Sequence, residues 1–157
     1  MFTMGVKRKT VGSVYASLGK SLTGPKHVKV GFPAGEADSL NISKAVWNEF
    51  GTRGGASGGG WGGPVPERPF MRNSLRENRG KYRDALRTSA AKILTGKTNM
   101  RVVLSKLGIV AQGDIQAEIT SLQSPPNSPV TIKLKGSSNP LIADGEMRGA
   151  VTYKVDQ

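Results

Sequence analysis

Half of the residues between positions 51 and 66 are glycine, and this segment divides the chain into two parts. Glycine has more backbone freedom than any other residue, so ordering such a stretch costs more conformational entropy than ordering a normal loop. Pro64 and Pro66 close the segment. We therefore predict a flexible loop over 51–66. Trp61 is its single aromatic residue, and it is either part of a disordered tether or an anchor that docks on a partner.

Two long helices are predicted after this loop. The first covers 69–94 and begins with Pro69, which suits a first turn. The second follows Gly96, with Thr98 or Asn99 as its cap, and continues to about Leu122. With about 100° between successive residues, a buried face of the first helix gathers Leu75, Tyr82, Leu86 and Ile93. A stripe of arginines lies roughly 80° to one side of that face: Arg72, Arg76, Arg79, Arg83 and Arg87.

Shorter elements are predicted before the loop. Apolar residues at helical spacing indicate a helix over 10–22, and alternation indicates a strand over 28–32. A two-turn helix capped near Asn41 and closed by Gly51 should follow, although a strand over 45–50 is an alternative.

The end of the chain alternates between apolar and polar residues in two places. We expect strands over 130–135 and 151–155 that pair antiparallel and join the strand at 28–32 in one sheet. The 157 residues then form a single α+β domain, 1–157, with a small, mostly antiparallel sheet and the two longer helices packed on one face.

The net charge of +12 is concentrated in one region. Between positions 68 and 106 there are eleven basic residues and two acidic ones, which leaves a net charge of +9. Such a field favours an anionic partner, either nucleic acid or an acidic protein face, unless the charges only form a solvated helix face.

Catalysis finds little support in the sequence. The chain has no cysteine, its only histidine is His27, and its carboxylates are scattered without the spacing of a metal loop or a hydrolase pair. We therefore predict a protein that is not an enzyme, with no catalytic, cofactor-binding or metal-binding residues. No run of 18 apolar residues is present, so no membrane partner is expected.

Two motifs flank the glycine-rich loop, Asn48-Glu49-Phe50-Gly51-Thr52 before it and Pro66-Glu67-Arg68-Pro69-Phe70-Met71-Arg72 after it. With Val30-Gly31-Phe32-Pro33, segment 108–119, and 135–142 ahead of a terminal strand, they resemble the tail-completion or neck proteins of tailed bacteriophages, a group also labelled virion morphogenesis or minor tail proteins. The similarity covers most of the chain from Val28 to Val155. The chain departs from the group in its longer glycine-rich loop and in Ala143-Asp144-Gly145, where Asp-Thr-Gly is usual.

The resemblance implies an α+β subunit that assembles into a ring, a hexamer or dodecamer, at the junction of head and tail. Its partners would be adaptor or connector proteins and tail-tube or terminator proteins, and its location the virion, with the host cytoplasm as the site of assembly. Structural roles in the family motifs fall to Asn48, Glu49, Phe50, Gly51, Pro66 and Pro69. Candidate interface residues are Trp61, Arg68, Phe70, Arg72, Arg76, Arg79, Arg83 and Arg87.

The sequence is therefore compatible with three functions. The first is a structural neck protein that completes the tail and joins it to the head. The second is a tail terminator that caps the tail tube. The third is a basic module that binds DNA without sequence preference, including DNA that passes through a channel.

Overall fold

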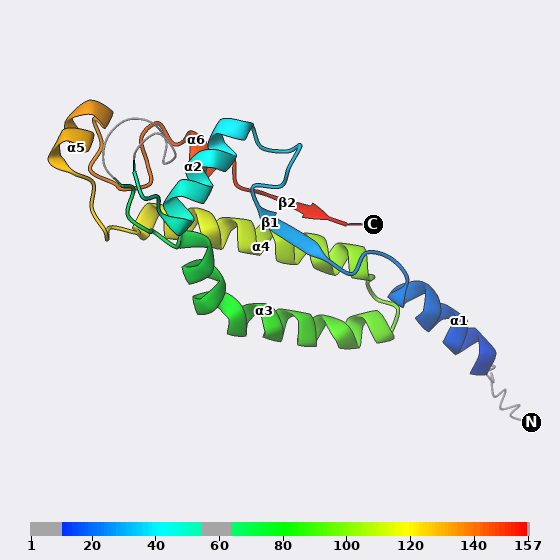
Figure 1. Cartoon of the computed structure of the whole chain (residues 1–157). Coiled ribbons are helices and arrows are strands. Elements are labelled where there is room, and N and C mark those ends of the chain that lie inside the picture. The colour runs from blue at the N-terminus through cyan, green and yellow to red at the C-terminus, as the bar shows by residue number, and fades with distance from the viewer. Residues whose placement is uncertain (1–10, 55–63, 157) are drawn as a thin grey trace, which may run out of the picture.

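The protein forms a single α+β domain in a computed structural model that describes residues 11–54 and 64–156. Trp61 and most of the predicted glycine-rich loop lie outside the described residues. The elements in chain order are α1 (Val11–Leu22), β1 (Val28–Gly31), α2 (Ser39–Phe50), α3 (Phe70–Leu94), α4 (Met100–Ser121), α5 (Pro129–Lys135), α6 (Glu146–Gly149) and β2 (Thr152–Val155) (Figure 1).

The helix α4 holds the fold together. The strands β1 and β2 pair antiparallel, with Val28 opposite Val155 and Gly31 opposite Thr152. Both strands pack on α4, and α3 packs along α4 as well, so that α4 runs between the sheet and α3 (Figure 1). Within the described residues no helix has the length and apolar character needed to cross a membrane.

The predicted helix starts are largely confirmed, because residue types that favour the N-cap position mark them in the sequence. Asn99 caps α4 by accepting the N–H of Val102 at 3.0 Å. The cap of α2 is Asp38, which accepts the N–H groups of Leu40 and Asn41, both at 2.9 Å. The expected start near Asn41 is therefore three residues too late, and the strand alternative for 45–50 is wrong because α2 continues through it.

The strand predicted over 130–135 is wrong, because this segment forms the helix α5. Signals for a helix stand at both ends of the segment. The Ser128 side chain caps α5 by accepting the N–H of Thr131, Pro129 occupies the first turn, and Gly136 ends the helix in the left-handed conformation with φ 70°. The sheet consequently has two strands among the described residues, and the alternation from Val130 onward reflects no buried face.

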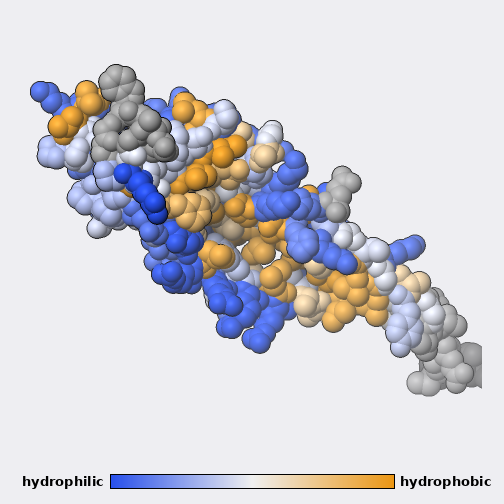
Figure 2. All heavy atoms as spheres, in the orientation of Figure 1, coloured by the Kyte–Doolittle hydropathy of each residue, from blue (hydrophilic) through white to orange (hydrophobic). Residues whose placement is uncertain are grey.

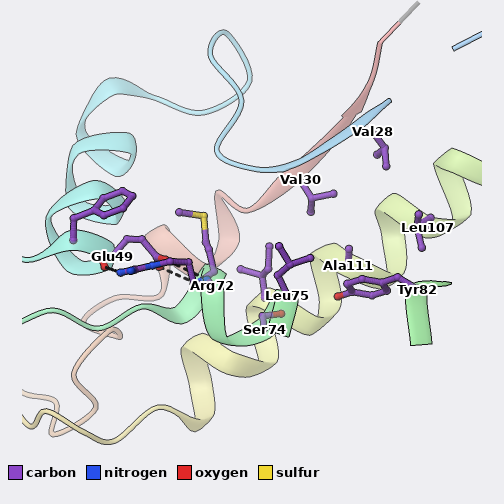
Figure 3. Close-up of a pocket in the computed structure, with 12 residues that line it drawn as sticks. Val28, Val30, Glu49, Arg72, Ser74, Leu75, Tyr82, Leu107 and Ala111 are labelled. Atoms are coloured by element: carbon purple, nitrogen blue, oxygen red, sulfur yellow. Dashed lines mark hydrogen bonds and ion pairs between the residues drawn. The ribbon is translucent and has the colours of Figure 1, made fainter. Parts of the chain in front are cut away.

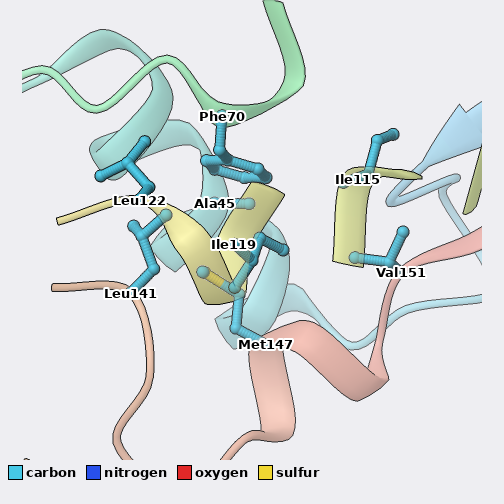
Figure 4. Packing of buried hydrophobic residues seen from close by; sticks show 8 residues of the cluster. All are labelled: Ala45, Phe70, Ile115, Ile119, Leu122, Leu141, Met147 and Val151. Atoms are coloured by element: carbon cyan, nitrogen blue, oxygen red, sulfur yellow. The ribbon is translucent and has the colours of Figure 1, made fainter. Parts of the chain in front are cut away.

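The main hydrophobic core lies at the C-terminal half of α4. Side chains from α2, the first residue of α3, α4, α6 and the loop before α6 meet there (Figure 4). The members of this core are Ala45, Phe70, Ile115, Ile119, Leu122, Leu141, Met147 and Val151. At the opposite end of the helix pair, Ile93 of α3 and Val103 and Leu104 of α4 are also buried. The packing of α3 against α4 is thus tightest near the two ends.

The contact between α4 and β2 requires a glycine. A Cβ added to Gly108 would lie 2.4 Å from Cδ2 and 3.1 Å from Cβ of Tyr153, too close for either residue to stay in place. The absence of a side chain at Gly108 therefore sets the distance between helix and sheet.

We expect Gly108→Ala to lower the free energy of unfolding by about 1–3 kcal/mol, because the strand must move away from the helix. Gly113→Ala is the matched control on the same helix, since an added Cβ there has no atom within 4 Å. That variant should gain up to about 1 kcal/mol from higher helix propensity. Urea unfolding of both variants would test this, and equal stabilities would contradict it.

Candidate functional site

The two motifs that flank the glycine-rich segment meet through the side chain of Glu49. This carboxylate is 1% exposed, and its oxygens accept the N–H groups of Met71 at 2.9 Å and Arg72 at 3.1 Å. Those N–H groups belong to the first turn of α3, where Pro69 occupies the cap position without a capping side chain. Glu49 of α2 therefore supplies the cap that α3 lacks, and negative charge is favourable at that end of a helix.

Arg72 completes this unit. Its Nε donates to Glu49 Oε1 at 2.9 Å, its Nη2 donates to the backbone oxygen of Glu49 at 2.6 Å and to the Glu67 carboxylate, and its guanidinium lies 5.1 Å from the ring centre of Phe50. The hydrogen bonds that Arg72 donates to the carboxylates of Glu49 and Glu67 raise the pKa of Arg72. We call Glu49, Phe50, Glu67 and Arg72 the clasp. Arg72, which was expected to face a partner, is largely satisfied within the subunit.

The ends of the glycine-rich segment are tied next to the clasp. Thr52 N–H donates to Val65 O at 2.9 Å, and Val65 N–H donates to Thr52 Oγ1 at 3.1 Å. Gly51 has φ 70°, and a Cβ there would lie 3.0 Å from Val65 O, so the close approach needs glycine. The segment therefore leaves the body and returns to it at one point.

Arg68 is a buried structural cation, 4% exposed. Its Nε donates to Pro125 O at 2.8 Å, its Nη1 to Asn48 Oδ1 at 3.1 Å, and its Nη2 to Pro126 O at 3.2 Å and Asn127 Oδ1 at 3.1 Å. Burial lowers the pKa of Arg68. The guanidinium thus ties the segment after α4 to α2, and its prediction as an interface residue is corrected by this burial.

The prediction of Phe70 as an interface residue is corrected in the same way. Its ring is fully buried in the main core and meets Phe32 edge to face, with ring centres 6.3 Å apart. Pro69 stands at the cap of α3, and Pro66 is exposed between the tied loop end and the clasp. The second motif therefore mainly joins elements within the subunit.

Four further exposed arginines of α3 lie outside the clasp: Arg76, Arg79, Arg83 and Arg87. We call them the arginine row. Among the described residues the only carboxylate within 4 Å of the row is Asp84, at 3.8 Å from Arg83 on the same helix. Figure 2 shows hydrophilic side chains gathered along α3 next to apolar ones. The row spans about 16 Å of helix and is available to an anionic partner.

Beside the arginine row lies an open apolar groove of about 440 Å³. Figure 3 shows side chains of β1, α3 and α4 that point toward this common space. Its apolar lining consists of Val28, Val30, Phe50, Met71, Leu75, Tyr82, Leu107, Ala111 and Ile115. We call this space the groove.

Because of the groove, the predicted buried face of α3 is only partly buried. Ile93 is buried and Tyr82 is half-buried, as expected, but Leu75 is 60% exposed and Leu86 is 40% exposed. The helical spacing placed these residues on one face correctly. It could not predict that the middle of this face is left open between the two packed ends.

Asp114 of α4 accepts hydrogen bonds from two side chains of α3 next to the groove. Tyr82 OH donates to Asp114 Oδ2 at 2.8 Å, and Lys81 Nζ donates to Asp114 Oδ1 at 2.7 Å. Burial, together with the hydrogen bond to Asp114, raises the pKa of Tyr82, which keeps its proton. The hydroxyl of Ser74 is buried beside Tyr82.

Neither a metal centre nor a known relative identifies the site. In the part of the chain that the structure describes, no three His, Cys, Asp or Glu side chains converge. Comparison with protein families, with characterised proteins and with solved structures finds no match. The clasp, the arginine row and the groove are therefore the features of the molecule that bear on its function.

We expect Glu49→Gln to lower the free energy of unfolding by about 2–3 kcal/mol, because an amide cannot accept all the hydrogen bonds at the start of α3 and leaves Arg72 without its buried partner. Glu67→Gln is the control, since Glu67 is exposed, and should cost less than about 1 kcal/mol. Guanidinium or urea unfolding measures both. Similar losses in the two variants would argue against Glu49 as the cap of α3.

Proposed function

We propose that this protein is a structural subunit of a tailed-phage virion that acts in the neck, completes the tail and joins it to the head through ring assembly. The observation that carries the proposal is the clasp. The motifs that resemble the tail-completion group stand far apart in the sequence, yet Glu49 and Arg72 join them into one charged unit. This coupling gives a physical reason for the two motifs to occur together.

Exposed apolar surface supports an assembly role. On α2 the large side chains Leu40, Val46, Trp47 and Phe50 are all exposed, and Phe50 is 63% exposed. Contiguous apolar surface on a subunit is typical of interaction sites. A ring needs two different complementary patches on each subunit, and this surface of α2 is our candidate for one of them. The expected states are a hexamer or a dodecamer.

Two alternatives stay open. A tail terminator would need the same kind of ring-forming subunit and differs only in where the ring sits. A DNA-binding module is favoured by the arginine row, whose four cations have a single described carboxylate near them. Against it, the row adjoins an apolar groove rather than a platform of aromatic side chains for bases.

Electron cryo-microscopy of the phage that encodes this chain tests the proposal directly. We expect density for an α+β subunit in a ring between the head's connector and the tail tube. A ring that contacts only the tube would favour the terminator. Absence of the subunit from mature particles would overturn the proposal.

A second experiment separates joining from DNA binding. In the triple variant Arg76→Glu, Arg79→Glu and Arg83→Glu, we expect joining of purified heads and tails to fall at least about tenfold, because opposite charges at a rim control association. All three side chains are exposed, so the urea unfolding midpoint should stay nearly unchanged. If affinity for a DNA duplex at low salt collapses while joining is normal, the DNA-binding module is the better account.

A further inference from the structure

The groove and the arginine row lie on neighbouring faces of α3. Leu75 is at the rim of the groove, and Arg79 and Arg83 lie about 40° and 80° around the helix from it. An occupant that extends past Leu75 would therefore come within reach of these two long side chains. One partner could therefore contact both the apolar groove and the positive charges of α3.

A second copy of this chain offers little unpaired negative charge to match these cations. All eleven Asp and Glu residues lie in the described part of the chain. Ten of them already accept a hydrogen bond or pair with a cation inside the subunit, and Glu77 alone has no such partner among the described residues: the ten are Glu36, Asp38, Glu49, Glu67, Asp84, Asp114, Glu118, Asp144, Glu146 and Asp156. With a net charge of +12, two copies would also repel at this surface.

The shape of the groove indicates what kind of segment fits. Its floor runs along α4 from Leu107 to Ile115, eight residues or about 12 Å. This length matches apolar residues at positions i, i+4 and i+7 of a partner helix, the usual pattern of a helix bound in a groove. A DNA backbone offers phosphates to the arginines, but it has no apolar side chains to fill the space between Leu75 and Leu107.

We propose that the groove binds an acidic amphipathic helix of a different protein, with its apolar side chains between β1, α3 and α4 and its carboxylates against the arginine row. The partner's identity as a virion protein rests on the proposed function, whereas its chemistry follows from the surface itself. The arginine row thus serves contact with another protein rather than contact between copies.

A peptide-display selection on the full-length protein tests the proposal. The probe is a library of randomised 16-residue helical peptides, selected in parallel on the unchanged protein, on Leu75→Gln and on Leu134→Gln. Leu134 is the matched control because it is 84% exposed on α5, outside the groove. We expect enrichment of acidic peptides with apolar residues at i, i+4 and i+7 on the unchanged protein and on Leu134→Gln, and its loss on Leu75→Gln.

Fluorescence anisotropy of the most enriched peptide then divides the surface into its two parts. Leu75→Gln should weaken binding about tenfold to a hundredfold. The double variant Arg79→Gln and Arg83→Gln should weaken it about fivefold to tenfold at low salt, with less effect at high salt. The matched double variant Lys97→Gln and Arg101→Gln, at exposed positions outside the row and the groove, should change binding less than about twofold.

Several outcomes would overturn the proposal. These are enrichment that survives Leu75→Gln, enrichment of neutral or basic peptides, and no enrichment at all. Binding of a 20-base-pair duplex that depends on Arg79 and Arg83, without any peptide selected, would assign the surface to DNA. Each of these results leaves the position of the subunit in the virion to be decided by microscopy, so failure here is distinct from failure of the proposed function.

Discussion

The carboxylate of Glu49 is the interaction on which the arrangement of this domain depends. It closes the first turn of α3 from a neighbouring helix, holds Arg72 against Phe50, and thereby fixes where the chain re-enters the body after the glycine-rich segment. A carboxylate this deeply buried is tolerated only because several donors converge on it. The position of α3, and with it the arginine row and one wall of the groove, follows from this unit.

Hydrophobic spacing predicted most of the helices and the two strands that pair, since each of these elements buries one face. It failed over 130–135, where caps at Ser128 and Gly136 outweigh an alternation that has no sheet to join. It also could not distinguish Leu75 from Ile93, which share a helix face. One lies over an open space and the other inside a packed end, and only the tertiary contacts of α3 decide between them.

The arginines show the same limit of sequence reasoning. Helical spacing placed Arg72 in one row with Arg76. Arg68 and Arg72 were both predicted as interface residues. The structure assigns Arg68 to backbone oxygens and amides, Arg72 to carboxylates, and leaves the exposed row beside the groove. The distinction arises from burial, because a cation removed from water must be surrounded by acceptors. The sequence held one signal for the role of Glu49. Pro69 stands at the N-cap of α3 and has no side chain that can cap the helix, so an acceptor must come from elsewhere.

The pairing of Thr52 with Val65 has a practical consequence for the engineering of this chain. Because the backbone at Thr52 and at Val65 is hydrogen-bonded beside the clasp, a change in chain length between Gly54 and Pro64 need not displace α2 or α3. Each doubling of such a closed loop costs only about 0.6 kcal/mol in chain entropy. An epitope or a fluorescent domain inserted there should leave the subunit intact, and natural lineages can lengthen or shorten it at little cost to folding.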